Sequence, residues 1–235
     1  MGVQRGKAPL AGELGWCPPR PFLSTPFLAR PVLSRPKELA SGGWSKEVFF
    51  FMTTLEPTIN SKRIYKGRVV GLRVDTVQLA EGRVSQRELV EHSPSVAIVP
   101  LDRERNVLLV RQYRKAVEQT LLEVTAGGLE EGEAPEDGAR RELDEETGYI
   151  AGHWEHLASF FLSPGYCDEE MHVFLATELA AGQPHPESDE NIEVVSVPIY
   201  SIPAMIQRGE IRDAKSIAAL LLVLRCQETT QRGSL

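Results

Sequence analysis

Residues 127–149 read GGLEEGEAPEDGARRELDEETGY, and this window is the most informative part of the chain. It carries a spaced pattern of glycine, glutamate and arginine: Gly127, Glu133, Arg141-Glu142-Leu143, Glu145-Glu146 and Gly148, followed by the bulky Tyr149. So many fixed identities at fixed spacing are not expected from composition alone. The window therefore indicates a specific structure.

The residue types in this window predict a helix over residues 135–147. Pro135 suits the first turn of a helix, where its missing N–H is not needed. Glu136 and Asp137 follow at the end where the helix dipole favours acidic side chains, and Gly148 stands where a helix would end.

Three carboxylates stand on one face of that helix. Glu142, Glu145 and Glu146 occupy positions i, i+3 and i+4, within a single turn. Like charges at this spacing repel by roughly a few tenths of a kcal/mol per pair, so the arrangement helps the helix only if a cation sits among them. A solvated acidic face is the alternative, but the glycine-rich lead-in and Arg141 favour a bound cation.

The expected cation is Mg2+, with Mn2+ as the other candidate. Hard divalent ions take oxygen ligands, and Mg2+ typically combines one or two protein carboxylates with water and substrate phosphates. Zinc is not expected, because the five His are scattered and Cys17, Cys167 and Cys226 show no paired spacing.

The window resembles the Nudix box, the signature of enzymes that hydrolyse a nucleoside diphosphate linked to another group. One position departs from it, since Tyr149 stands where an aliphatic residue is usual. The resemblance implies an α/β/α sandwich with a mixed sheet and a small N-terminal antiparallel sheet. The box would form a loop, a helix and a loop.

The resemblance also implies a metal site, carried over by position. Its ligands would be Glu142 and Glu146, with Glu145 alongside as a further ligand and a catalytic carboxylate. The backbone carbonyl of Ala126 would be another donor. Glu133 and Arg141 would form an organising ion pair that holds the loop against the helix.

Length and composition fit one such domain with an extension. The chain has 235 residues, and its 42% hydrophobic fraction is sufficient for a core. Its 33 acidic against 26 basic residues argue against a nucleic-acid partner. The sequence contains no run of eighteen apolar residues, so no membrane-spanning segment is expected. The three Cys show no paired spacing, which suggests a reducing, cytoplasmic setting.

The chain divides into three expected regions. Residues 1–51 are rich in proline and lack a helical or strand period, so we expect a disordered extension. A targeting peptide is one interpretation, although the prolines would break its amphipathic helix; a natural start at Met52 is the other. Residues 52–93 would form a dimerising β-sheet region, and residues 94–230 the Nudix hydrolase domain.

The apolar patterning outside the box predicts strands and two C-terminal helices. Strands are expected over 62–79 and 84–92, joined by a turn at Glu81-Gly82, and over 96–101 and 107–111 as a second hairpin. Further strands are expected over 155–162 and 171–177. The helices would cover residues near 201–208 and residues 213–226, the second capped by Asp213.

Five separated segments narrow the resemblance to the ADP-ribose pyrophosphatase branch of the family. They are IYKGRVVGLRVDTVQL, RELVEH, VRQYR, the Ser-Pro-Gly turn with Pro164 fifteen residues past the box, and DAKSIAALLL. The resemblance covers roughly residues 60–226.

The branch implies where the substrate binds. Arg87 and Arg114 become candidates for gripping phosphates or the terminal ribose, because guanidinium groups suit anionic oxygens. Tyr65 could stack on adenine, and Pro164 and Gly165 would border the substrate. Members of this branch are homodimers, in which residues 60–92 would cross to the partner and complete its site.

The implied reaction is Mg2+-dependent hydrolysis of the pyrophosphate of ADP-ribose to AMP and ribose 5-phosphate. The segment PHPESDENIEV, residues 184–194, is a polar acidic loop where the branch keeps its catalytic glutamate. Glu190 matches best and Glu187 is second.

Two alternatives to ADP-ribose hydrolysis stay open. The substrate could be another nucleoside diphosphate sugar, such as GDP-mannose. The domain could instead be a non-catalytic ligand sensor, but such domains tend to lose the helix carboxylates that this chain keeps.

Overall fold

A computed structural model of the chain describes residues 55–183 and 192–232. The extension predicted for residues 1–51 and the candidate bases Glu187 and Glu190 lie outside the described residues. No helix in the described ranges is long and apolar enough to cross a membrane.

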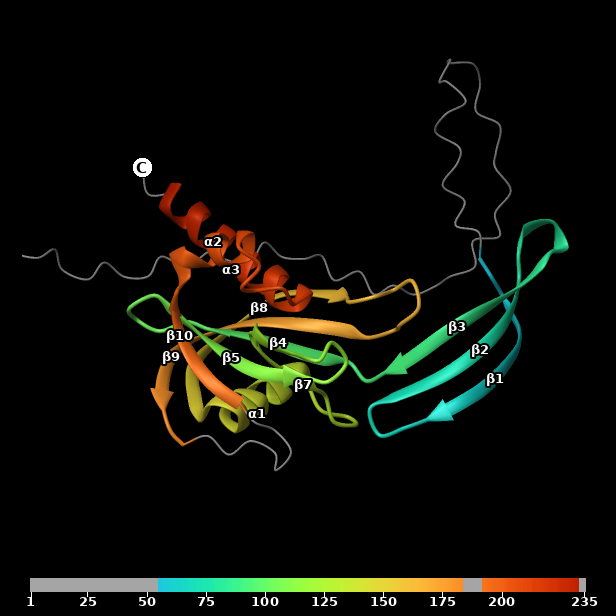
Figure 1. Cartoon of the computed structure of the whole chain (residues 1–235), viewed down its shortest axis with the longest axis horizontal. Coiled ribbons are helices and arrows are strands. Elements are labelled where there is room, and N and C mark those ends of the chain that lie inside the picture. The colour runs from blue at the N-terminus through green and yellow to red at the C-terminus, as the bar shows by residue number, and fades with distance from the viewer. Residues whose placement is uncertain (1–54, 184–191, 233–235) are drawn as a thin grey trace, which may run out of the picture.

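The described chain forms three sheets and three α-helices (Figure 1). A first antiparallel sheet has the order β1-β2-β3, a second the order β10-β5-β6, and a third the order β7-β4-β9-β8, in which β4 and β9 are parallel. The bounds are β1 Thr58–Lys66, β2 Val70–Gln78, β3 Val84–His92, β4 Ser95–Pro100, β5 Asn106–Arg114, β6 Gln119–Glu123, β7 Thr125–Gly128, α1 Pro135–Thr147, β8 Tyr149–Phe161, β9 Glu170–Ala181, β10 Ile192–Pro198, α2 Ile202–Gln207 and α3 Ala214–Arg232.

The strand β4 lies at the centre of the molecule and is buried on both faces. Val96 and Ile98 pack in the cluster that contains Leu143 of α1, whereas Ala97 and Val99 pack in the cluster that contains Leu220 of α3. Because successive strand residues point to opposite faces, one continuous apolar strand supplies both cores. The predicted α/β/α sandwich with a mixed sheet is confirmed, with α1 on one side of the strands and α3 on the other (Figure 1).

The box helix α1 has the bounds that the sequence predicts. Pro135 occupies its first turn, and Glu136 and Asp137 lie at its positive end. Gly148 ends it in the left-handed conformation, with φ 70°, and donates its N–H to the carbonyl of Asp144 at 2.7 Å. A residue with a side chain would be strained in this conformation, so the box requires glycine there.

Two expectations about the strands are wrong. The strand predicted over 62–79 is two strands, β1 and β2, because the chain reverses at Gly67, whose N–H bonds the carbonyl of Val70. The hairpin predicted from 96–101 and 107–111 does not form, because β4 and β5 join different sheets and share only the bridge between Leu101 and Val107. The backbone N–H and C=O groups of a buried strand need hydrogen-bond partners along both edges. For β4, the strands β7 and β9 provide them.

Other expectations need smaller corrections. The strand predicted over 155–162 begins earlier, at Tyr149, directly after the box helix. The acidic loop predicted over 184–194 is shorter, since Ile192 already belongs to β10. The strands β6, β7 and β10 were not expected, while Asp213 does cap α3 by accepting the backbone N–H of Ser216 at 3.0 Å.

The sheet β1-β2-β3 projects from the body of the molecule (Figure 1). Every residue of β1 is exposed, and the sheet is tied to the body through β3. Val90 of β3 donates its N–H to the carbonyl of Tyr166 at 2.7 Å, and His92 donates its N–H to the carboxylate of Asp168 at 2.9 Å. The predicted N-terminal antiparallel sheet is therefore present.

Replacing Gly148 should destabilise the fold at the end of α1. Gly148→Ala forces a side chain into the left-handed region, and we expect a loss of about 1 kcal/mol of unfolding free energy, or roughly 2–4 °C in melting temperature. Gly165→Ala is the matched control, because an added Cβ there meets nothing within 4 Å. Equal melting temperatures for the two variants, measured by circular dichroism, would contradict this explanation.

Candidate active site

The box glycine at position 127 leaves room for a carboxylate. Gly127 lies in β7, and a Cβ built on it would come within 2.0 Å of the carboxylate of Glu142 on α1. The neighbouring Gly128 has no such restriction, since an added Cβ meets nothing within 4 Å. A side chain at the first position of the box would therefore displace the carboxylate of Glu142 from its place against β7.

Arg141 is bonded through all five of its N–H donors. Nε and Nη2 bond the two carboxylate oxygens of Glu133 at 3.0 and 2.9 Å, and Nη2 also bonds the carbonyl of Gly128 at 3.0 Å. Nη1 bonds Glu142 at 2.7 Å and Glu145 at 3.1 Å. These bonds raise the pKa of Arg141, chiefly through Glu133. One guanidinium group therefore joins the box loop, β7 and two of the helix carboxylates.

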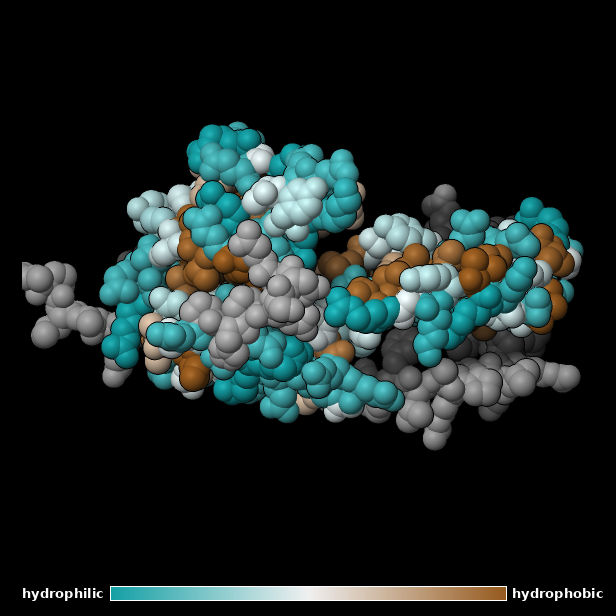
Figure 2. All heavy atoms as spheres, turned by 60° about the horizontal axis from the view of Figure 1, so that its bottom comes forward, coloured by the Kyte–Doolittle hydropathy of each residue, from teal (hydrophilic) through white to brown (hydrophobic). Residues whose placement is uncertain are grey.

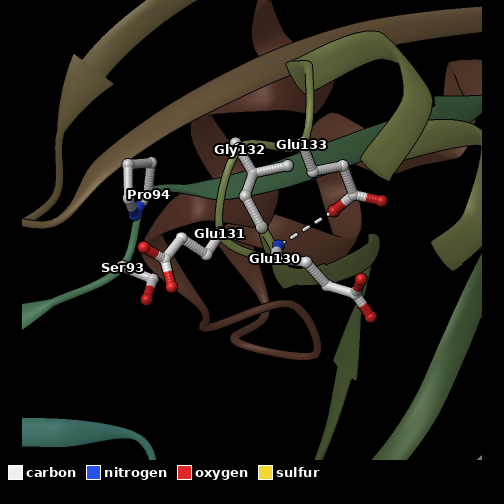
Figure 3. Close-up of a pocket in the computed structure, with 7 residues that line it drawn as sticks. Ser93, Pro94, Glu130, Glu131, Gly132 and Glu133 are labelled. Carbon is white, nitrogen blue, oxygen red and sulfur yellow. Dashed lines mark hydrogen bonds between the residues drawn. The ribbon is translucent and has the colours of Figure 1, made fainter.

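The predicted ion pair between Glu133 and Arg141 is confirmed. Glu133 also accepts the backbone N–H of Glu130 at 2.9 Å, which closes the loop between β7 and α1 (Figure 3). The hydrogen bond from Arg141 lowers the pKa of Glu133, so the pair is ionised at neutral pH. The pair fixes the loop against the helix, as the sequence predicts.

A hollow of about 420 Å3 lies over this loop, between the box and the link from β3 to β4. Ser93 and Pro94 form one side and Glu130, Glu131 and Gly132 the other (Figure 3). The carbonyl of Pro94 accepts the N–H of Leu129 at 2.8 Å. The box loop is thereby attached to the segment that carries the projecting sheet.

The three helix carboxylates differ in exposure. The side chain of Glu145 is 35% exposed and that of Glu142 is 13% exposed, whereas the residue Glu146 is only 3% exposed. The Oε2 atom of Glu146 accepts no hydrogen bond within the described ranges, although this side chain interacts electrostatically with Arg114. A buried carboxylate oxygen of this kind fits a cation ligand.

The donors near α1 fit a hard divalent ion in chemical type, because all of them are oxygens. They are the carboxylates of Glu142, Glu145 and Glu146 and the backbone carbonyl of Ala126, which lies in β7 beside Gly127. In the described part of the chain, no three acidic, His or Cys side chains converge closely enough to hold a metal ion. In this conformation Arg141 binds two of the candidate ligands, so metal binding would require them to turn.

A larger pocket of about 430 Å3 lies beside the box strand β7. Its walls come from five parts of the chain. They are His92 and Ser95 around the β3–β4 link, Arg114 of β5, Ala126, Gly127 and Gly128 of β7, Leu162, Ser163, Glu169 and Met171 around the β8–β9 loop, and Asp213, Ala214 and Lys215 at the start of α3. The pocket therefore adjoins the strand against which the metal-site candidate Glu142 packs.

The predicted substrate residues fall into two groups. Arg114 lines the pocket, and Ser163 brings the Ser-Pro-Gly turn to its edge, although Pro164 and Gly165 are not in the lining. Tyr65 and Arg87 lie on the projecting sheet, outside the pocket lining of this chain. Arg87 forms a two-pronged ion pair with Glu56, at 2.8 and 2.7 Å.

The sequence reasoning missed a buried charged group behind Arg114. Glu123 is 1% exposed and binds both Arg114 and Lys215. A signal was present, since a lone glutamate between Leu122 and Val124 interrupts an apolar run, and a charge in such a run needs a partner. The partner could not be found from spacing, because Lys215 lies 92 residues away.

Comparisons with known proteins agree on one family. A family model described as a NUDIX domain matches residues 91–220. An ADP-ribose pyrophosphatase of Bacillus subtilis (strain 168) is 41% identical over 167 residues, which cover 70% of this chain and 90% of the relative. A methanol dehydrogenase activator of Bacillus methanolicus is 39% identical over 170 residues, with the same two coverages.

A GDP-mannose pyrophosphatase of Citrobacter koseri is 35% identical over 144 residues, or 57% of this chain and 75% of the relative. Among solved structures, an ADP compounds hydrolase superposes with a TM-score of 0.68, over 75% of this chain and 96% of that chain, at 22% identity. That likeness supports the fold alone.

The family model matches more than half of the chain, and the box, its helix and its packing lie inside the match. The chain belongs to the NUDIX family. The match begins at residue 91, so most of the projecting sheet lies outside it.

Gly127→Ala should disturb cation binding through Glu142. Its Cβ would occupy the space of the Glu142 carboxylate, so we expect Mn2+ affinity, measured by titration, to fall about tenfold or more. Gly128→Ala, one residue further along β7, should bind Mn2+ as the natural chain does. Equal affinities for the two variants would remove Glu142 from the metal site.

Proposed function

We propose that the protein hydrolyses the pyrophosphate bond of ADP-ribose to AMP and ribose 5-phosphate, with Mg2+ as the cofactor. The observation that carries the proposal is the packing of the Glu142 carboxylate against β7, one wall of a pocket that Arg114 also lines. The 41% identity to an ADP-ribose pyrophosphatase over most of both chains supports the choice of substrate.

The residues around the pocket have distinct roles in this reaction. Arg114 binds the diphosphate, because a guanidinium group donates paired hydrogen bonds to anionic oxygens. Glu142, Glu145 and Glu146, with the carbonyl of Ala126, would hold Mg2+. When bound, Mg2+ offsets the charge of the diphosphate and lowers the pKa of water. Mn2+ fits the same oxygen donors.

Hydrolysis needs a base as well as a metal site. Water attacks one phosphorus, the bond from that phosphorus to the bridging oxygen breaks, and the base accepts a proton from the water. We assign the base to Glu190, with Glu187 as the second candidate, in the segment between β9 and β10. Glu145 is the alternative on α1, because its side chain is the most exposed of the three.

A second candidate substrate is GDP-mannose, which the 35% identical relative from Citrobacter koseri favours. Both substrates are nucleoside diphosphate sugars, so the metal site and Arg114 would serve either. A non-catalytic sensing role is less well supported, because all three helix carboxylates are present. ADP-ribose and GDP-mannose differ in their nucleobase and in their sugar, so turnover of a panel of nucleoside diphosphate sugars separates the two candidate substrates.

We also propose that the protein is a homodimer formed through the projecting sheet. Apolar side chains gather on this sheet (Figure 2), and the large exposed ones of its strands are Ile59, Ile64, Tyr65, Val70 and Val84. An exposed apolar patch of this kind is typical of a protein–protein contact surface. A second copy of the chain would cover this surface and bring Tyr65 and Arg87 to the partner's pocket.

Domain boundaries and location belong to the same proposal. The dimerising region would comprise residues 52–93 and the hydrolase domain residues 94–230. We place the protein in the cytoplasm, a setting with which the free thiols of Cys167 and Cys226 are compatible.

Glu146→Gln should abolish most of the activity while the fold is retained. With ADP-ribose and Mg2+ we expect AMP release to fall by about two orders of magnitude or more, because the variant loses a metal ligand and keeps its shape. Glu136→Gln is the matched control, since Glu136 lies on the same helix and forms an exposed ion pair with Arg140. Unchanged turnover by Glu146→Gln would rule out the ligand assignment.

The same assay tests the proposed substrate when ADP-ribose and GDP-mannose are compared. We expect the higher kcat/KM for ADP-ribose. A preference for GDP-mannose would shift the proposal to the second candidate, and no turnover of any nucleoside diphosphate sugar with Mg2+ or Mn2+ would contradict hydrolysis.

Mixing two inactive variants tests the shared site. If Arg87 serves the partner's pocket, an Arg87→Ala subunit and a Glu146→Gln subunit complement each other, because one site of the mixed dimer has both groups intact. Equal mixing should restore about a quarter of the natural activity, since half the dimers are mixed and each has one good site. No recovery despite verified subunit exchange would contradict the crossed dimer.

A further inference from the structure

A buried carboxylate lies directly behind Arg114. Glu123 ends β6, and its side chain is 1% exposed. Its Oε1 accepts a hydrogen bond from Nε of Arg114 at 3.0 Å. Its Oε2 accepts hydrogen bonds from Nη2 of Arg114 at 2.8 Å and from Nζ of Lys215 at 2.5 Å. Burying a charge is costly unless it is paired and hydrogen bonded, and here two cations pair with one carboxylate.

The carboxylate is fixed by a closed circuit of hydrogen bonds. Lys215 also donates to Asp213 Oδ2 at 2.9 Å, and that oxygen accepts the hydroxyl of Ser216 at 2.6 Å. The Ser216 hydroxyl in turn accepts the backbone N–H of Val124 at 2.9 Å, the residue that follows Glu123. The circuit joins the first turn of α3 to the end of β6, so the Glu123 side chain is held from both sides.

Arg114 is the most exposed of the charged side chains in this group. Its side chain is 37% exposed, whereas that of Lys215 is 12% exposed and that of Glu123 is 1% exposed. The two bonds to Glu123 occupy Nε and Nη2, which leaves Nη1 outside this pairing. The two hydrogen bonds to Glu123 therefore fix the plane of the Arg114 guanidinium, and Arg114 lines the pocket.

The charges of the group are balanced. Two carboxylates, Glu123 and Asp213, face two cations, Arg114 and Lys215. Burial by itself would raise the pKa of Glu123, but the hydrogen bond from Arg114 and the charge and hydrogen bond of Lys215 lower it overall. The carboxylate stays ionised at neutral pH, and Arg114, Lys215 and Asp213 of the group line the pocket.

We propose that Glu123 and Lys215 are positioning residues, which hold the guanidinium of Arg114 in the orientation that binds the diphosphate of the substrate. This inference rests on the proposed function, in which Arg114 binds that diphosphate. A guanidinium held in advance loses less rotational freedom when it binds, so the pairing strengthens diphosphate binding without a contact of its own.

A double-mutant cycle on affinity for ADP tests the inference. The full chain and the variants Arg114→Ala, Lys215→Met and Arg114→Ala/Lys215→Met are titrated with ADP by calorimetry. The titrations use Ca2+ in place of Mg2+, because Ca2+ binds oxygen ligands without the octahedral geometry of Mg2+, so that binding is measured without turnover. We expect each single substitution to weaken binding about tenfold, and the double variant to bind no more than about twofold weaker than Arg114→Ala.

Conservative replacement provides the control. Lys215→Arg keeps a cation next to Glu123 and should recover binding to within about threefold of the natural chain. Melting temperatures of all variants accompany the titrations. A lower melting temperature for Lys215→Met with natural ADP affinity would reduce Lys215 to a structural role and overturn the inference.

Additive losses would also overturn it, because they would show that Lys215 acts independently of Arg114. Glu123→Gln, which keeps the shape and loses the charge, should weaken ADP binding in the same direction as Lys215→Met. A failure of this inference can be distinguished from a failure of the proposed function. The proposed function is tested by turnover of ADP-ribose by the natural chain, whereas the cycle measures only binding of ADP.

Discussion

The hydrogen bonds of Arg141 are the constraint on which the rest of the site depends. Three carboxylates within one helical turn repel one another, and a single guanidinium binds two of them while it ties Glu133 and the carbonyl of Gly128 to the same point. The glycine at position 127 allows the carboxylate of Glu142 to lie against β7. In this structure the box packs a strand, a loop and a helix against one another through Arg141 and Gly127.

The strand β7 connects this unit to a second charged group. Ala126, Gly127 and Gly128 of β7 line the pocket, and the carboxylate of Glu142 packs against Gly127. Glu123, which binds Arg114 and Lys215, lies two residues before β7 begins at Thr125. This arrangement suits a substrate that carries a diphosphate, which needs a cation on one side and hydrogen-bond donors on the other.

The sequence predicted the features that depend on residues close together in the chain. The bounds of α1 follow from Pro135 and Gly148, and the ion pair of Glu133 with Arg141 follows from the resemblance to the Nudix box. Pairing between distant strands was not predictable in this way, so β4 and β5 were wrongly joined in a hairpin. The partnership of Glu123 with Lys215 was missed for the same reason, because burial and long-range contact leave only a weak trace in one sequence.

The central claim is that the box carboxylates gather around a divalent cation. The most direct measurement is anomalous diffraction from crystals of the protein with Mn2+ and ADP. We expect a Mn2+ peak bonded to Glu142 and Glu146 and near the carbonyl of Ala126, with Glu142 turned away from Arg141. A Mn2+ peak elsewhere, or Arg141 still bonded to Glu142 at saturating Mn2+ with no peak at α1, would contradict it.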